Sequence, residues 1–186
     1  MRPVIIGTEG SLRDAVVNGI AGELGVPIIR ADKAAVADRY GISAPIHAND
    51  PHKVAEYLET LTELHSSMVD GHRGRSMIIT DSVFESLAYF MATCWDAVDG
   101  ATSRIVYRNC IDYARSKYTG QIFLMVLTGI NYFHNEGTLF ADGMMREYMY
   151  EMIITGLLNR WDIKYTPIIV ENMEEGISEL LLRIRT

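Results

Sequence analysis

The sequence is 186 residues long, 48% hydrophobic and 22% charged, which is enough for one substantial buried core and excludes a disordered or fibrous chain. Its net charge of −7 argues against a broad basic face for duplex DNA or anionic lipid. We therefore expect a single domain, residues 1–186, that binds a nucleotide, another small molecule or a protein, including a second copy of itself.

The beginning of the sequence lacks the pattern of a secretory signal peptide, and no apolar run approaches the ~18 residues that a membrane span needs. We therefore expect a cytoplasmic protein. Cys94 and Cys110 lack C-x-x-C spacing, which favours reduced thiols in the core. The five histidines show neither H-x-x-x-H nor H-E-x-x-H spacing, so no metal site is expected.

The first two dozen residues have the order strand, glycine loop, helix, which is typical of a phosphate-binding turn. An apolar run at 3–6 ends at Gly7, and a helical pattern begins near Leu12. A P-loop reads G-x-x-x-x-G-K-[ST], and counting from Gly7 places Leu12 at the second glycine, Arg13 at the lysine and Asp14 at the hydroxyl. Only the first glycine of that motif is kept.

A second interpretation of the same turn is purely structural. Ser11 to Asp14 fits the capping box S-x-x-[DE], in which Ser11 caps the helix and Asp14 reaches back to its first residue. The helix would then supply its own anion, and Glu9 would add negative charge beside it. The sequence leaves both interpretations open, a capped turn and a phosphate site that includes Gly10.

Further along the chain, short apolar runs alternate with helical patterns. This alternation predicts a three-layer α/β/α sandwich whose five-stranded, mainly parallel sheet is covered on both faces. Asp50 and Pro51 are expected to begin one helix, and Asp81 or Ser82 another. The expected strands are 3–6, 26–29, 76–79, 121–127 and 165–170, and the expected helices are 12–24, 31–40, 51–69, 84–98, 103–117, 144–161 and 173–185.

Several stretches together resemble the P-loop nucleoside and nucleotide kinase-like ATPases, a group that includes small AAA-type ATPases and phage-type deoxynucleotide kinases. Besides the Gly7 turn, the segment 79–89, ITDSVFESLAY, resembles that family's I-D-R-[ST]-x-x-D-x-L-A-Y motif. The segment 135–142, NEGTLFAD, is similar to its D-D-G-V-R-x-x-D lid, within a lid-like loop at about 128–142. The resemblance implies the strand order 2-3-1-4-5.

The chain departs from this family at several positions of these motifs, most of which contact phosphate or Mg²⁺ in the family. Thr80 stands at the position of the family's Asp, Asp81 at that of an Arg, and Leu139 at that of the lid Arg. Arg13 and Asp14 replace the lysine and the Mg²⁺-binding hydroxyl of the turn. Because phosphoryl transfer depends on positive charge around the transferred group, these changes predict a degenerate Walker A motif and a weakened or lost activity.

The candidate site residues follow from the turn and from the resemblance. If a cofactor binds, Gly7, Gly10, Ser11, Arg13 and Asp14 are expected to contact it. Arg13 and Glu85 are the candidate catalytic residues, and substrate contacts are assigned to Asp81, Glu85, Arg108 and Arg115. For Glu85, and for Arg104, Arg108 and Arg115 on one predicted helix, the alternative is a solvated helix face.

The leading functional hypothesis is a degenerate nucleotide-kinase-like protein that binds a nucleotide or a protein partner with little or no ATP-dependent phosphotransfer. One alternative is an active nucleoside or deoxynucleotide kinase that uses ATP and Mg²⁺ with Arg13 and a displaced basic cluster. The other is a non-enzymatic interaction or assembly protein, for which ten methionines and ten tyrosines supply an adaptable surface.

Overall fold

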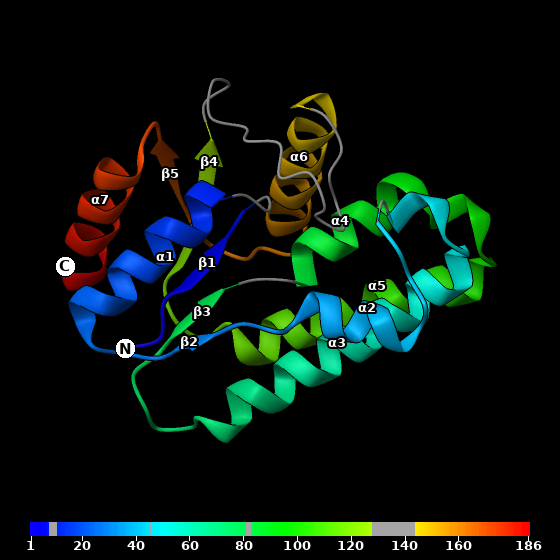
Figure 1. Ribbon diagram of the computed structural model, residues 1–186, viewed down its shortest axis with the longest axis horizontal. Helices are drawn as coiled ribbons and strands as arrows, with labels where there is room; N and C mark the ends of the chain where they lie inside the picture. Colours follow the sequence, from blue (N-terminus) through cyan, green and yellow to red (C-terminus); the bar gives the residue numbers. More distant parts are fainter. Residues whose placement is uncertain (8–10, 45, 81–82, 128–143) are drawn as a thin grey trace.

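The computed structural model describes residues 1–7, 11–44, 46–80, 83–127 and 144–186, without the side chains of residues 11, 47, 127 and 144–147. A five-stranded sheet forms its centre, in the order β2-β3-β1-β4-β5 with every pair parallel (Figure 1). The predicted sheet, its parallel pairing and its strand order are therefore confirmed. The strands are β1 Val4–Ile6, β2 Ile28–Ile29, β3 Ile78–Thr80, β4 Ile122–Leu127 and β5 Thr166–Val170.

Helices cover both faces of the sheet, and they do so unequally (Figure 1). One core, with Ile5 of β1, lies beneath α1 and α7, whereas the larger core, with Val4 and Ile6, lies beneath α2 to α6. Neighbouring residues of β1 thus point to opposite faces, as in any strand. The helices are α1 Ser11–Leu24, α2 Lys33–Arg39, α3 Pro51–Gly71, α4 Val83–Thr93, α5 Gly100–Lys117, α6 Met144–Arg160 and α7 Met173–Arg185.

Most helix ends lie where the sequence signals place them. The Asp50 side chain accepts a hydrogen bond from the His52 backbone, with Pro51 in the first turn of α3, as predicted. Gly25 and Gly41 have φ angles of 63° and 62° just after α1 and α2, a left-handed conformation that glycine adopts without strain. The predicted cap at residues 81 and 82 lies outside the described residues.

Most boundaries that differ from prediction do so by one or two residues, and three of the differences alter an element more clearly. The strand expected at 26–29 is reduced to Ile28–Ile29. The helix expected to reach Val98 ends at Thr93 and is followed by a short 3₁₀ turn, Trp95–Ala97. Helix α5 begins three residues earlier than expected, because the Asp99 side chain accepts hydrogen bonds from the Ala101 and Thr102 backbones.

Both cysteines are buried in the larger core and neither forms a disulfide, as expected. Within the described parts of the chain, no helix combines the length and the hydrophobicity required to cross a bilayer.

Helix α7 packs against α1 and β5 at a point where there is no room for a side chain. A Cβ atom at Gly176 would lie 2.9 Å from a methyl carbon of Val16 and equally close to one of Val170. Both neighbours are β-branched and cannot swing away easily. Glycine at this position therefore sets how closely α7 approaches the sheet.

We expect Gly176→Ala to lower the free energy of unfolding by about 1–3 kcal/mol, because the new methyl group overpacks the Val16–Val170 contact. The matched control is Gly22→Ala in α1, where no described atom lies within 4 Å of a Cβ. That control should be neutral or stabilising by up to about 1 kcal/mol. Urea denaturation followed by circular dichroism measures both, and equal stability of the two variants would contradict this account.

Candidate functional site

The carboxyl ends of β1, β2 and β3 meet at one edge of the sheet, because these three strands are parallel neighbours. Ligands of open α/β sheets bind at this edge. Gly7 follows β1, Arg30 follows β2, and Thr80 ends β3. The Thr80 side chain is buried and its hydroxyl donates a hydrogen bond of 3.2 Å to the Ile29 carbonyl oxygen, which ties β3 to β2.

Gly7 follows the last residue of β1 and lies close to the backbone of the neighbouring strand β4. A Cβ atom at this position would lie 3.0 Å from the Met125 carbonyl oxygen and 3.3 Å from the Met125 Cβ atom. The glycine therefore has a packing reason to be there, apart from any contact with a phosphate. Residues 8–10, including the predicted contact Gly10, lie outside the described residues.

Arg13, at the position of the P-loop lysine, is turned inward. Its side chain is buried, and its Nη1 atom donates a 2.6 Å hydrogen bond to the Gly7 carbonyl oxygen. The same atom lies 3.6 Å from Oε2 of Glu85. The guanidinium of Arg13 thus binds groups of the protein itself, the Gly7 carbonyl oxygen and the Glu85 carboxylate.

Glu85 is the centre of this charge cluster. The residue is only 2% exposed, and its Oε2 atom accepts a 2.8 Å hydrogen bond from Nζ of Lys33. The opposite charges of Arg13 and Lys33 offset part of the cost of removing this carboxylate from water. The alternative of a solvated helix glutamate is therefore wrong.

A second, more accessible ion pair borders the cluster. Oδ1 of Asp14 lies 3.1 Å from Nη2 of Arg30 and 3.7 Å from Nε of Arg13. The Asp14 and Arg30 side chains are 38% and 36% exposed, against 5% for Arg13. Arg30 is therefore the most exposed cation of this cluster, although its Nε and Nη2 atoms are buried. The Ser11 side chain lies outside the described part of the chain, so the capping box stays a prediction.

The structure brings together Arg13, Asp14 and Glu85 of the predicted site, but not the predicted substrate arginines. Arg108 and Arg115 are exposed on α5 and line a different groove, with Arg104. Asp81 and the lid-like loop, 128–142, lie outside the described residues. The solvated helix face weighed for these arginines fits what is observed.

Sequence reasoning missed Lys33 and Arg30. Both lie within four residues after the second apolar run, at the sheet edge where ligands of such folds bind. Their position after this run was the signal that could have identified them. The pairing itself was not predictable from spacing, because 52 residues separate Lys33 from Glu85.

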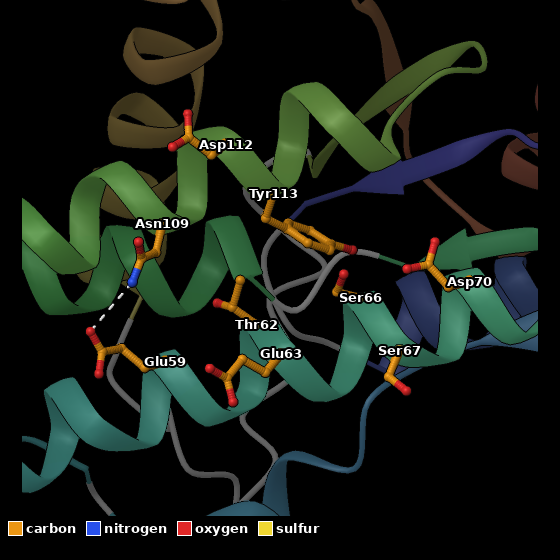
Figure 2. Close-up of a pocket in the computed structure, with 9 residues that line it drawn as sticks. All are labelled: Glu59, Thr62, Glu63, Ser66, Ser67, Asp70, Asn109, Asp112 and Tyr113. Atoms are coloured by element: carbon orange, nitrogen blue, oxygen red, sulfur yellow. Dashed lines mark hydrogen bonds between the residues drawn. The ribbon is translucent and has the colours of Figure 1, made fainter.

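A groove between α3 and α5 can be excluded as an anion site (Figure 2). Its volume is about 560 Å³, and its charged lining residues are all acidic: Glu59, Glu63, Asp70 and Asp112. A hydrogen bond from Lys117 lowers the pKa of the Asp70 carboxyl, which keeps it negatively charged. Phosphate would be repelled there, so the sheet edge remains the better candidate.

Solved structures show what this architecture is similar to. Deoxyadenosine kinase from M. mycoides with bound dCTP superposes with a TM-score of 0.70 at 12% identity, covering 100% of this chain and 99% of that one. The same enzyme with bound dATP gives 0.68 at 13% identity, with 100% of both chains covered. The chain has a deoxyadenosine-kinase-like fold.

The likeness concerns the fold, because the sequence identities are low. No protein-family model matches the chain, and no curated protein sequence matches it either. Among the residues that the structure describes, no group of three or more His, Cys, Asp or Glu side chains is placed to hold a metal ion. Expectations about chemistry on this kinase-like fold therefore depend on the charge cluster itself.

We expect Glu85→Gln to lower the free energy of unfolding by about 3 kcal/mol or more, because it leaves Arg13 and Lys33 buried beside a neutral amide. The control is Glu179→Gln, which removes the exposed partner of Arg183 on α7 and should cost less than about 0.5 kcal/mol. Guanidinium denaturation compares the two. A Glu85→Gln protein as stable as the parent would show that the cluster does not hold the site together.

Proposed function

We propose that this protein is a degenerate member of the nucleotide-kinase-like fold, which binds a nucleotide at the carboxyl edge of β1, β2 and β3 and transfers little or no phosphoryl group. The observation that carries the proposal is the position of Arg13, whose guanidinium is hydrogen-bonded to Gly7 and paired with Glu85. A cation used in this way is not directed at a phosphate in solvent.

The chemistry of phosphoryl transfer supports the same conclusion. Catalysis of this reaction consists mainly of positioning and of positive charge around the transferred oxygens, usually with Mg²⁺ held by a hydroxyl and a carboxylate. Here the position of that hydroxyl holds Asp14, whose carboxylate faces Arg30 at 3.1 Å. Arg13 and Asp14, at the positions of the P-loop lysine and of the hydroxyl, are thus each paired with a charge of the protein itself, which supports the proposal.

Binding of a nucleotide, by contrast, requires fewer precisely placed cations than phosphoryl transfer does. The described part of the cluster contains three cations, Arg13, Arg30 and Lys33, and two carboxylates, Asp14 and Glu85, in a chain of net charge −7. The structural neighbours named above hold dCTP and dATP. We therefore propose a deoxynucleotide as the ligand, with Arg30 as its accessible anion contact.

We expect isothermal titration calorimetry to detect dATP or dCTP binding with the same affinity in Mg²⁺ and in EDTA, because the Asp14 carboxylate is paired with Arg30 and not with a metal ion. In parallel, a coupled assay with ATP and a panel of deoxynucleosides should show no turnover above background. Turnover at an ordinary enzymatic rate, about 1–100 s⁻¹ for kinases, would overturn the proposal. If Arg13→Gln then abolished that turnover, the active-kinase alternative would replace it.

We also expect Arg30→Gln to weaken dATP binding by about threefold to tenfold, because it removes the accessible cation of the cluster, whereas the affinity for deoxyadenosine should change little. The matched control is Arg73→Gln, an exposed arginine paired with Asp70 at the end of α3, which should leave both affinities unchanged. Equal losses for nucleoside and triphosphate would contradict a phosphate contact at Arg30.

A further inference from the structure

A groove of about 520 Å³ lies where the end of α4, helix α5 and the second half of α6 meet, away from the sheet edge. We call it the α5–α6 groove. Its apolar floor is formed by Met91, Trp95, Ile153 and Leu157. The charged residues that line it are both cations, Arg104 from α5 and Arg160 from α6, and both are exposed. Such a lining favours a ligand with an apolar anchor and negative charge.

The aromatic wall of this groove is fixed in place. The Tyr107 ring packs edge-on against Trp95 at 6.0 Å and against Trp161 at 5.3 Å. The Tyr107 hydroxyl also accepts a 2.9 Å hydrogen bond from Nε1 of Trp161. A rigid aromatic wall loses little conformational entropy when a partner binds, which is how preorganised sites gain affinity.

Gly156 keeps the groove open. It lies within α6, and no described atom is within 4 Å of the position that its Cβ would occupy. Glycine inside a helix costs about 1 kcal/mol relative to alanine. Unlike Gly176, this glycine therefore has no packing contact in the described structure that offsets its cost. At this position, in the lining of the groove, the absence of a side chain leaves space for an occupant.

The apolar surface continues along α6 beyond the groove. Met149, Ile153, Gly156 and Arg160 are spaced i, i+4, i+7 and i+11, and so share one helix face. Met149 and Met152 are 40% and 65% exposed. At 1.5 Å per residue the stripe is roughly 16 Å long, more than a small ligand covers and about the length of a short peptide segment. Methionine side chains adapt readily to a partner surface.

We propose that the α5–α6 groove is a docking site for an acidic segment of a partner protein. One aromatic or long aliphatic side chain of that segment enters beside Trp95 and Gly156. Its carboxylates pair with Arg104 and Arg160. The charge complementarity is local, because the chain as a whole carries a net charge of −7. This proposal is independent of nucleotide binding at the sheet edge, so either can fail alone.

The test is selection from a displayed library of random peptides, each about twelve residues long to match the stripe, with the full-length protein as the target. The expected result is enrichment of peptides that combine an aromatic or aliphatic anchor with two or more Asp or Glu residues. Fluorescence anisotropy of one enriched peptide then measures its affinity, which should fall as salt is raised. No enrichment, or enrichment of peptides without acidic residues, would overturn the proposal.

Two variants locate the binding site. Gly156→Trp fills the groove, and the matched control Gly22→Trp adds the same side chain at an open position on α1. Arg104→Glu combined with Arg160→Glu reverses the charge without filling the groove, so it tests the site even if Gly156→Trp folds poorly. We expect a loss of affinity of about tenfold or more for Gly156→Trp and for the charge reversal, and none for Gly22→Trp.

Other occupants have distinct outcomes. Sedimentation equilibrium showing a dimer that Gly156→Trp dissociates would make a second copy of the chain the occupant, and would overturn the proposal. Competition of the peptide by an oligothymidylate would indicate a single-stranded nucleic acid instead, with the same consequence. Peptide binding that survives both groove variants would place the site elsewhere.

Discussion

The buried carboxylate of Glu85 is the constraint on which the rest of this site depends. Glu85 lies in the first turn of α4. It is paired with Arg13, which is bonded to Gly7 after β1, and with Lys33, the first residue of α2. Three segments that are distant in sequence are thus fixed relative to one another by one negative charge. Removing water from such a charge is costly unless its partners stay in place, so the cluster holds the edge of the sheet in one arrangement.

This arrangement is the basis of the proposal that the kinase-like architecture carries out little or no phosphoryl transfer. In a working phosphate turn, the cation and the backbone donors face an open site and are completed by the ligand. Here Arg13 is hydrogen-bonded to the Gly7 carbonyl oxygen and paired with Glu85, and Asp14 is paired with Arg30. The protein thus provides its own counterions. The interaction that stabilises the edge is the same one that withdraws positive charge from a phosphate.

The sequence predicted the elements better than it predicted the site. Alternating apolar runs and local caps such as Asp50 determine elements through neighbouring residues, and the resemblance supplied the strand order. The strand ending at Ile29 was shorter than its apolar run, because pairing with β3 rather than hydrophobicity decides where a strand begins. The Lys33–Glu85 pair depends on tertiary contact across 52 residues, and no local pattern encodes such a contact.

The central place of β1 in the sheet has a consequence for the order of folding. This strand lies near the N-terminus, yet Val4 pairs with Ile79 on one side and with Ile122 on the other. Most of the chain must therefore leave the ribosome before both edges of β1 are covered. Until then its apolar residues Val4, Ile5 and Ile6 stay exposed to non-native pairing during synthesis.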